Sequence, residues 1–450
     1  MRRRRGDEVS RRWITQGFGI ASMSVLGALV AAFASCATNN EGEAVGEDAS
    51  TSTLPEAAAD AEADAERDSS CELPDAQCTG PVVPCESVSW CMESTPVTPR
   101  HALTAVWGTS RSDVWAVGSG GSIIHYDGSA WTQTPTNVPS TLFAIGGSGP
   151  HDIWVASSAE YLLHGSGYTN GTAEWTNEAP VGRTPVDIDR DTILSAVWVS
   201  STSDVRLGTA VGDFGYPIRI MDPTFMYFGS GNQLAPLNVD DGGLRWRTIP
   251  GKGSVASIWG SSDDDVWMAV DKGGTERGLL LHGTGYTGPA PNPTLLADRG
   301  CVVGCYPGCT ACAAVDDRFA WTSIDSQSKL AFRAIWGSSE SDVWAVGEGG
   351  NIRRYQTGDP RFQRIASPTP HTLRAIWGSG PSDVWMVGDE GTILHFDGTT
   401  VSESTAQFPL GAKPHLRGVW GSGPSDVWIV GDGIVLHYTG RNPSHAEGGR

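Results

Sequence analysis

One pattern of roughly 40 residues recurs along this chain and restricts its fold more than any other feature. The stretch LRAIWGSGPSDVWMVGDEGTILHFDG begins at Leu373, and LRGVWGSGPSDVWIVGDGIVLHYTG begins 43 residues later at Leu416. Alignment on this pattern gives seven copies, which open at Leu103, Leu142, Leu194, Val255, Phe332, Leu373 and Leu416. The openings are 39 to 77 residues apart, so the shortest interval defines the unit and the longer intervals contain insertions.

Each of the first six copies predicts four short β-strands. Two apolar runs, such as LRAIWGS and DVWMVG, are separated by turn residues, and a third run ends in an Asp-Gly hairpin signal. A more polar fourth run carries an aromatic residue. Strands that are apolar on both sides require sheets stacked face to face, so we expect an all-β, seven-bladed β-propeller with four-stranded antiparallel blades. A β-solenoid is the alternative, but its repeats are shorter and rarely contain four turns.

The ends of the repeat array predict how the ring closes. The last copy ends at Gly440 with three strands instead of four, and the segment SVSWCMESTPVTP before the first copy resembles a fourth strand. We therefore expect residues 87–95, around Trp90, to complete the last blade and to leave no exposed sheet edge. The propeller then spans 96–440, and residues 441–450 form a disordered tail.

Composition agrees with an all-β fold and excludes one class of partner. The chain has 57 Gly and 18 Trp residues, and its formal charge is −20 without a basic stripe, which argues against nucleic-acid binding. Ten acidic residues and one arginine lie between positions 41 and 68. A segment of this kind cannot bury enough apolar surface to fold, so a disordered linker is predicted.

The N-terminus predicts export. A basic start, an apolar run at 20–33 and small residues identify 1–35 as a signal peptide. The sequence Phe33-Ala34-Ser35-Cys36 resembles a bacterial lipobox, although Phe33 replaces the usual aliphatic residue. The resemblance implies lipidation of Cys36, a lipidated linker over 36–70 and anchoring at the outer membrane, on its periplasmic or cell-surface side. The alternative is an ordinary cleaved signal, or an uncleaved anchor, with Cys36 incidental.

Residues that recur in the repeat are interpreted as scaffold. The shared aspartates are expected to accept backbone N–H bonds in the turn before the second strand, and the tryptophan two residues later is expected to pack between blades. The aspartates are Asp113, Asp152, Asp204, Asp265, Asp342, Asp383 and Asp426. The third strands carry His125, His164, His282, His395 and His437. These histidines belong to different blades, too far apart to share one metal ion, so we interpret them as structural or solvent-facing.

The run WGSGPSDVW, followed by VG and TILHFDG, resembles a repeat of exported Gram-negative lipoproteins. It is also similar to the propeller repeat of photosystem II assembly factors and, more loosely, to BNR/Asp-box proteins. The likeness covers about residues 87–440 and implies a propeller without implying its ligand. The Asp-box spacing is not met, because Asp127 and Gly128 are adjacent. The WD40 and kelch signatures are absent, and the photosystem role is not carried over.

Insertions predict a binding surface. Residues 213–243 and 288–320 lengthen the connection between the third and fourth strands in copies three and four, and copy two lengthens it less. Neighbouring loops on one face would form a raised rim that presents aromatic side chains. Its candidates are Tyr168, Tyr216, Phe225, Tyr227, Tyr286 and Tyr306. The alternative is that these loops only pack on one another.

Besides Cys36, the cysteines form two groups of four. The first, in the Cys-rich lead-in 71–91, contains Cys71, Cys78, Cys85 and Cys91, and the second contains Cys301, Cys305, Cys309 and Cys312. No histidine lies near either group, which disfavours metal or haem. Because an exported chain sits in an oxidising compartment, we expect two disulfides in each group.

These features predict a non-enzymatic, monomeric cell-envelope lipoprotein. It would bind an envelope protein or a polysaccharide through the loops of blades two to four. The alternative is a glycoside hydrolase or lyase, for which the insertions offer only the carboxylate pairs at 240–241 and 316–317. Acidic pairs in loops are usually solvated and occasionally bind Ca²⁺, so we expect no cofactor and no metal.

Overall fold

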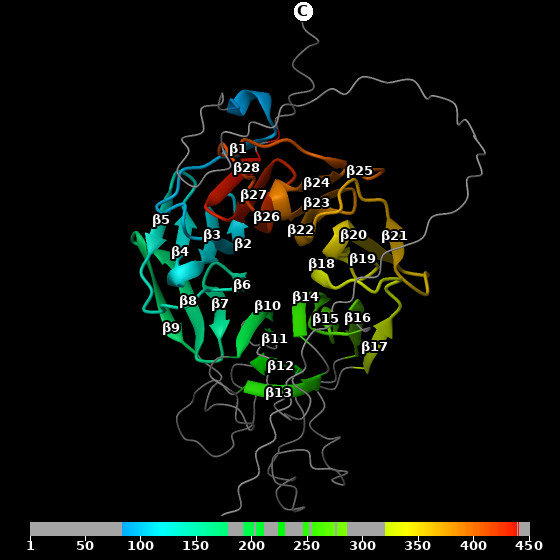
Figure 1. Ribbon diagram of the computed structural model, residues 1–450. Helices are drawn as coiled ribbons and strands as arrows, with labels where there is room; N and C mark the ends of the chain where they lie inside the picture. The colour runs from blue at the N-terminus through cyan, green and yellow to red at the C-terminus, as the bar shows by residue number, and fades with distance from the viewer. Residues whose placement is uncertain are drawn as a thin grey trace, which may run out of the picture. The chain divides into compact units, whose positions relative to one another are not determined.

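The computed structural model describes residues 83–178, 192–201, 204–210, 224–229, 246–251, 254–274, 277–285, 320–438 and 440. All of these belong to one of the two compact units of the chain, Arg67–Arg450. Their strands surround a common axis (Figure 1), and each repeat runs outward from an innermost strand. The predicted all-β propeller architecture with four-stranded antiparallel repeats is confirmed. The predictions for 1–35, 36–70 and 441–450 lie outside the described residues.

The strands of the first four repeats are given in order from the axis outward. Repeat one contains β2 (Leu103–Ser110), β3 (Asp113–Gly118), β4 (Ile123–Tyr126) and β5 (Trp131–Thr134). Repeat two contains β6 (Ala144–Gly149), β7 (Asp152–Ser158), β8 (Tyr161–Thr169) and β9 (Thr172–Asn177). Repeat three contains β10 (Ile193–Ser201), β11 (Asp204–Ala210), β12 (Thr224–Gly229) and β13 (Trp246–Gly251). Repeat four contains β14 (Ser254–Ser262), β15 (Asp265–Asp271), β16 (Leu279–Thr284) and β17 (Ala320–Ile324).

The remaining repeats follow the same order. Repeat five contains β18 (Phe332–Ser339), β19 (Asp342–Gly347), β20 (Asn351–Gln356) and β21 (Gln363–Ile365). Repeat six contains β22 (Leu373–Gly380), β23 (Asp383–Gly388), β24 (Ile393–Phe396) and β25 (Val401–Glu403). Repeat seven contains β26 (Leu416–Gly423), β27 (Asp426–Gly431) and β28 (Ile434–Tyr438). Short 3₁₀ turns are η2 (Cys85–Ser87), η3 (Ser119–Gly121), η5 (Glu348–Gly350) and η6 (Asp389–Gly391).

The prediction of seven blades is wrong, because the described strands form six sheets. Five sheets have four strands, and the sixth has eight, contributed by repeats two and three. The two repeats are joined where Ile193 of β10 pairs with Ser158 of β7. Strand β6 begins only at Ala144 and leaves the end of β7 without an inner neighbour from its own repeat. Strand β10 occupies that place, so the two repeats make one blade.

Neighbouring repeats pack through a tryptophan and a glycine of their innermost strands. A Cβ atom added to the glycine would lie 2.5–2.8 Å from the indole of the preceding repeat, so only glycine leaves room for the ring. Six junctions have this arrangement: Trp107–Gly147, Trp198–Gly260, Trp259–Gly337, Trp336–Gly378, Trp377–Gly421 and Trp420–Gly108. In the recurring WG dipeptide, the tryptophan therefore packs on the following repeat, and the glycine receives the tryptophan of the preceding repeat.

The junction between repeats two and three departs from this rule. Gly146 stands where the other repeats have the tryptophan, and Val199 stands where they have the glycine. Without an indole, the two backbones come close, and the carbonyl oxygen of Val197 would lie 3.3 Å from a Cβ atom on Gly146. This is the same junction at which the two repeats share a sheet.

Strand β1 (Trp90–Met92) closes the ring as the sequence predicts. It pairs antiparallel with β28, with Trp90 opposite Tyr438 and Met92 opposite Leu436. This completes a four-stranded sheet in the order β1-β28-β27-β26. The side chain of Trp90 is fully buried.

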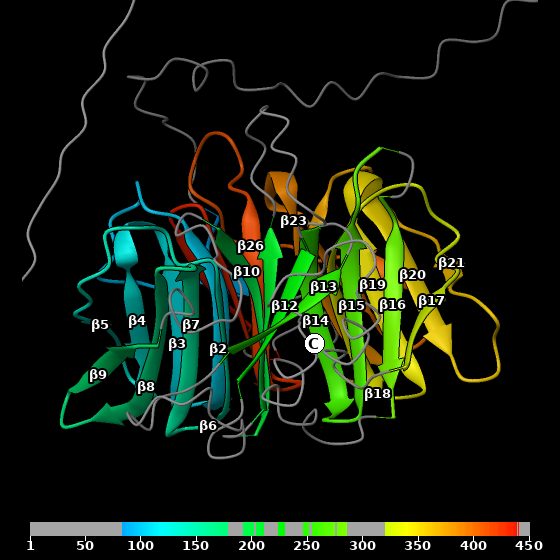
Figure 2. The ribbon, with the colours of Figure 1, turned by 90° about the horizontal axis from the view of Figure 1, so that it is seen from below.

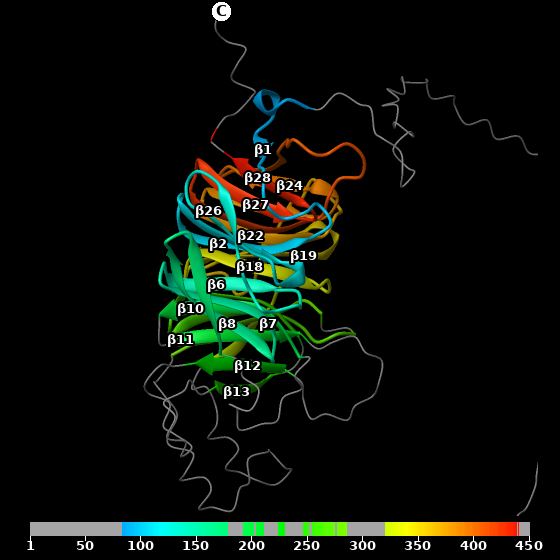
Figure 3. The ribbon, with the colours of Figure 1, turned by 90° about the vertical axis from the view of Figure 1, so that its left-hand side faces the viewer.

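The innermost strands all begin on one face of the ring, which we call the start face, and end on the opposite face, the turn face. Edge-on views show both faces (Figures 2 and 3). Residues 285–319 join β16 to β17 at the turn face, as expected. The extra residues of repeat three, in contrast, are divided between 211–223 and 230–245, because β12 begins only at Thr224. Part of this insertion thus connects strand ends at the start face.

Candidate functional site

On the turn face, the shared aspartates bind the third-strand histidine of the same repeat. The His Nε2–H donates to the Asp Oδ1 in five repeats. The distances are 2.8 Å for His125–Asp113, 2.9 Å for His164–Asp152, 2.6 Å for His282–Asp265, 2.7 Å for His395–Asp383 and 2.7 Å for His437–Asp426. The expectation that the aspartates act through backbone N–H groups is therefore incomplete, because side chains supply their main partners.

A hydroxyl group and a tryptophan ring complete each constellation, and the indole N–H also donates to the aspartate in repeats one and two. Ser148 Oγ donates to Asp152 Oδ2 at 2.5 Å, and Trp154 Nε1 donates to Oδ1 of the same aspartate at 3.0 Å. The imidazole of His164 stacks on Trp154, with ring centroids 4.2 Å apart. In repeat five, an arginine replaces the histidine: Arg354 Nε donates to Asp342 at 2.6 Å, and the guanidinium lies 4.6 Å from the centre of the Trp344 ring.

The order of these side chains argues against nucleophilic catalysis. In a hydrolase triad the histidine stands between the hydroxyl and the carboxylate, and it accepts the hydroxyl proton. Here the carboxylate stands in the middle, so both the hydroxyl and the histidine donate to it, and the histidine is not placed to accept the hydroxyl proton. Among the residues that the structure describes, no group of three or more His, Cys, Asp or Glu side chains could hold a metal ion. The constellations tie the third strand to the turn, which is a scaffold role.

The electrostatics of these aspartates support that role. Burial by itself raises the pKa of Asp152, but the hydrogen bonds from His164, Ser148 and Trp154 outweigh it, and the pKa is lowered. Burial likewise raises the pKa values of Asp113, Asp265, Asp383 and Asp426, and the hydrogen bonds from the histidine and the hydroxyl group of each repeat lower them more; Trp115 adds a third bond to Asp113. The carboxylates are thus ionised at neutral pH and bound to donors of their own repeat.

On the start face, four arginines of neighbouring repeats lie beside carboxylates. Arg333, Arg374 and Arg417 occupy the second position of β18, β22 and β26, where a β-bulge interrupts the pairing with the next strand. Arg417 binds Asp432 through two nitrogens, at 2.6 and 3.2 Å. Arg374 binds both oxygens of Asp389 in the same way.

Repeats four and five are linked across their junction by the same chemistry. Glu348 Oε1 accepts from Arg333 of its own repeat and from Arg277 of repeat four, each at 2.7 Å. Arg277 also lies 3.3 Å from Asp271. The four arginine side chains are 33–40% exposed, which is more than most of their carboxylate partners. The guanidinium groups therefore face solvent at the rim of the start face, and we call these four residues the arginine row.

The predicted rim residues and cysteines have different outcomes. Tyr168 is half-buried in β8 and stacks on His125 with ring centroids 4.0 Å apart. Phe225 and Tyr227 belong to strand β12, not to a loop. Cys85 and Cys91 form a disulfide. Lying outside the described residues are Cys36, Cys71, Cys78, Tyr216, Tyr286, Cys301, Cys305, Tyr306, Cys309 and Cys312.

The arginine row was not predicted from the sequence, although the sequence contains a pattern that indicates it. Repeats five, six and seven each have an arginine as the second residue of the copy, and an acidic residue follows 15 positions later. The same spacing in consecutive copies indicates charge pairs at equivalent places around the ring. Arg277 carries no such signal, because it lies in the turn between the second and third strands of repeat four.

No protein-family model and no curated protein matches this chain. Among solved structures, it is similar to YCF48 bound to D1 peptide, with a TM-score of 0.52 and 15% identity over 78% of this chain and 97% of that one. The WD40 β-propeller domain of Doa1 has a TM-score of 0.51 and 9% identity over 80% and 99% of the two chains. YCF48 from Cyanidioschyzon merolae has a TM-score of 0.50 and 15% identity over 79% and 100%. At these identities, the likeness shows that the chain has a β-propeller fold.

Proposed function

We propose that this chain is a non-enzymatic binding propeller that holds a carboxylate-bearing segment of a partner protein on its start face. The observation that carries the proposal is the arginine row, in which three equivalent positions of repeats five to seven, and Arg277 from a turn of repeat four, present guanidinium groups to solvent. A row along adjacent repeats suits an extended peptide, since successive carboxylates of the peptide would meet successive arginines.

The arginines keep donors available for such a ligand. A guanidinium has five N–H donors, and an internal carboxylate such as Asp432 occupies two of those of Arg417. Arginine and carboxylate groups form strong, charge-assisted pairs. Because the neighbouring carboxylates weaken the local positive field, we expect binding to be moderate and to fall with added salt. The likeness to a propeller that is bound to a peptide supports the use of this fold for peptide binding.

The proposal includes the cellular location. A signal peptide over 1–35 and lipidation of Cys36 would hold the ring at the cell envelope, so the partner would be an envelope protein. Cys36→Ala is expected to release the full-length protein into the soluble fraction and to abolish metabolic lipid labelling. Membrane association and labelling that survive this change would contradict the anchor.

An enzymatic function has less support from the described residues. Six of the seven shared aspartates on the turn face are bound to a histidine or an arginine of their own repeat, and the side chain of Asp204 lies outside the described part of the chain. The acidic pairs at 240–241 and 316–317 lie outside the described residues. The proposed aromatic rim of repeats two to four remains a second contact surface for a protein or polysaccharide, and the experiment below distinguishes it from the arginine row.

The test is capture of envelope proteins by purified variants, with identification by mass spectrometry. Arg374→Gln/Arg417→Gln should lose partners that wild type retains, because charge-assisted hydrogen bonds contribute about 1.5–3 kcal/mol each. The folded ring should persist, because exposed ion pairs contribute only about 0–1 kcal/mol. Arg361→Gln/Arg364→Gln is the matched control, since these exposed arginines lie just before and within the outermost strand β21, away from the arginine row.

Equal capture by the wild type and the Arg374/Arg417 variant would show that the arginine row is not the site. In that case, a chain shortened between residues 288 and 318 tests the rim. Loss of partners in the shortened chain alone would assign binding to the turn face. Partners that are released by soluble polysaccharide would identify a glycan ligand instead of a peptide.

A further inference from the structure

Strand β1, which closes the ring, is unusually short. Strand β1 contains only three residues, yet it completes the last sheet and joins the two ends of the ring. It is held on its outer side as well: Ser89 N–H donates to Thr405 O at 3.1 Å, and Gln407 N–H donates to Trp90 O at 2.9 Å. A strand of this length makes few hydrogen bonds, and each contributes about 0.5–1.5 kcal/mol net.

Trp90 provides most of the packing in this strand. Its ring is fully buried and lies 4.9 Å from the ring of Trp385 in repeat six and 5.1 Å from Tyr438 in repeat seven. Its Nε1–H donates to Ser404 Oγ at 3.2 Å. The indole therefore spans two repeats, and it can leave only if the backbone of β1 leaves with it.

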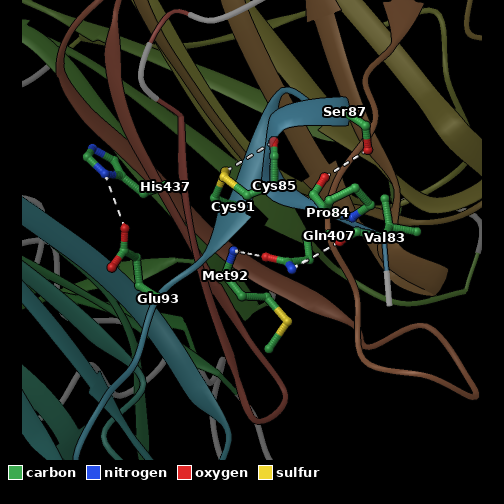
Figure 4. Close-up of a disulfide and its surroundings, with 9 residues drawn as sticks. All are labelled: Val83, Pro84, Cys85, Ser87, Cys91, Met92, Glu93, Gln407 and His437. Atoms are coloured by element: carbon green, nitrogen blue, oxygen red, sulfur yellow. Dashed lines mark hydrogen bonds and ion pairs between the residues drawn. A yellow bond between two sulfur atoms is a disulfide. The ribbon is translucent and has the colours of Figure 1, made fainter. Parts of the chain in front are cut away.

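The disulfide Cys85–Cys91 is attached to this strand. Figure 4 shows that it joins the turn η2 to the middle residue of β1, beside Gln407 and His437. The bond closes a loop with a sequence separation of 6 residues, and the loop contains Trp90. Both cysteines are half-buried, so a reducing agent has access to the bond. Among the described residues, this is the one disulfide of the ring.

Gln407 and Glu93 add non-covalent links at the same place. The side chain of Gln407 accepts from Met92 N–H at 3.1 Å and donates to Val83 O at 3.0 Å, so it bridges the two ends of the disulfide-closed segment. Glu93 N–H donates to Val435 O at 2.9 Å. These contacts depend on residues 83–93 remaining folded back on themselves, which is the conformation that the disulfide maintains.

We propose that closure of the ring is under redox control, with the Cys85–Cys91 disulfide acting as the lock on strand β1. A dithiol reductant supplies two electrons and two protons. The sulfur–sulfur bond breaks, Cys85 and Cys91 become thiols, and the dithiol becomes a disulfide. Strand β1 then detaches as a unit and exposes the edge of β28 together with the aromatic site of Trp90, while repeats one to six remain folded.

The chain-entropy argument sets the size of the effect. A cross-link that closes a loop this short restricts the detached segment enough to change the opening equilibrium by about 50-fold. An effect of this size is small beside the stability of a whole ring, but it is large for a three-residue strand. An unpaired strand edge is also a template for pairing with another chain, so the reduced form is expected to associate more readily.

The experiment is amide hydrogen exchange of the full chain, measured by mass spectrometry. Under oxidising conditions, amides in 89–93 and 434–438 and the amide of Gln407 should exchange about 50-fold faster in the Cys85→Ser/Cys91→Ser variant than in wild type, and amides in the strands of repeats one to six should be unchanged. Dithiothreitol should produce the same change in wild type and no further change at these segments in the variant. Ser87→Ala is the matched control, because it changes the same loop, removes only the bond to Pro84 O and keeps the disulfide.

Three results would overturn the proposal. Equal exchange in wild type and the double variant would show that the disulfide does not hold β1. Faster exchange across repeats one to six would show that it stabilises the whole ring and is not a local lock. A dithiothreitol effect at 89–93 that persists in the variant would assign the control to the other cysteines of the chain.

Discussion

Two junctions of the ring contain the same repeat and pack differently. Between repeats six and seven, Trp377 lies on Gly421, and the two repeats form separate sheets. Between repeats two and three, Gly146 and Val199 occupy the corresponding positions, and the two repeats share an eight-stranded sheet. The indole thus acts as a spacer between neighbouring backbones, and its loss accompanies hydrogen bonding between repeats.

The two substitutions at this junction compensate for each other. The one repeat that loses the tryptophan precedes the one repeat that gains a side chain at the glycine position. A valine next to an intact tryptophan would clash, and a glycine next to a missing tryptophan would leave a void. Each alternative costs stability, because protein interiors are close-packed.

The largest effect is expected at the junction between repeats six and seven. Gly421→Ala places a Cβ atom 2.6 Å from the Trp377 ring and 2.7 Å from the carbonyl oxygen of Asp426. We expect a loss of about 3 kcal/mol in the free energy of unfolding, measured by chemical denaturation. Gly423→Ala is the control, because nothing lies within 4 Å of its added Cβ atom. Equal losses in the two variants would show that the indole is not the obstacle.

The second prediction converts the unusual junction into the common one. Gly146→Trp alone should destabilise the protein by about 1–3 kcal/mol, because the indole meets Val199 and the backbone of Val197. Adding Val199→Gly should recover part of that loss, with a coupling energy of about 0.5–3 kcal/mol in a double-mutant cycle. The amide of Ile193 should also exchange faster if the shared sheet separates. Additive effects of the two substitutions would show that residues 146 and 199 do not compensate for each other.

The third prediction concerns pH at the closing junction. Burial lowers the pKa of His437, but its contacts with Asp426 and Glu93 raise it more, so the net pKa lies above the ordinary value of 6.5. Arg111 also faces Asp426 and Tyr126 here. The stability that His437 contributes is therefore fully present below pH 6.5 and is lost as the pH rises through the raised value in the folded protein.

His437→Gln tests this dependence by chemical denaturation at a series of pH values. The difference in unfolding free energy from wild type should shrink as the pH rises above 6.5. At every pH we expect this difference to be smaller than the loss in either packing variant. His395→Gln is the matched control, because His395 has the same bond to an aspartate and the same stacking on a tryptophan, and its described ion pair involves a single carboxylate. Identical pH curves for the two variants would rule out a special role for Glu93.

The repeat pattern was sufficient to predict the strands and the closing segment, because each depends on local apolar alternation and turn residues. Trp90, for example, was placed in the last sheet because the final copy lacks a fourth strand. The partners of the aspartates were not predicted, although the histidines follow at nearly constant spacing. The arginine row was missed for a related reason, since its members are 41 to 56 residues apart in the chain and are brought together only by the ring.

A closed ring of four-stranded units could be predicted from the sequence, since strands that are apolar on both faces need a sheet packed on each side, and since the last copy lacks the strand that the segment around Trp90 supplies. The number of blades could be seen only in the folded ring, because the pairing of Ile193 with Ser158 depends on the distance between two backbones. That distance is set by side chains from both repeats together, here Gly146 and Val199. The pattern of a single copy does not contain this distance, because it depends on residues of two copies.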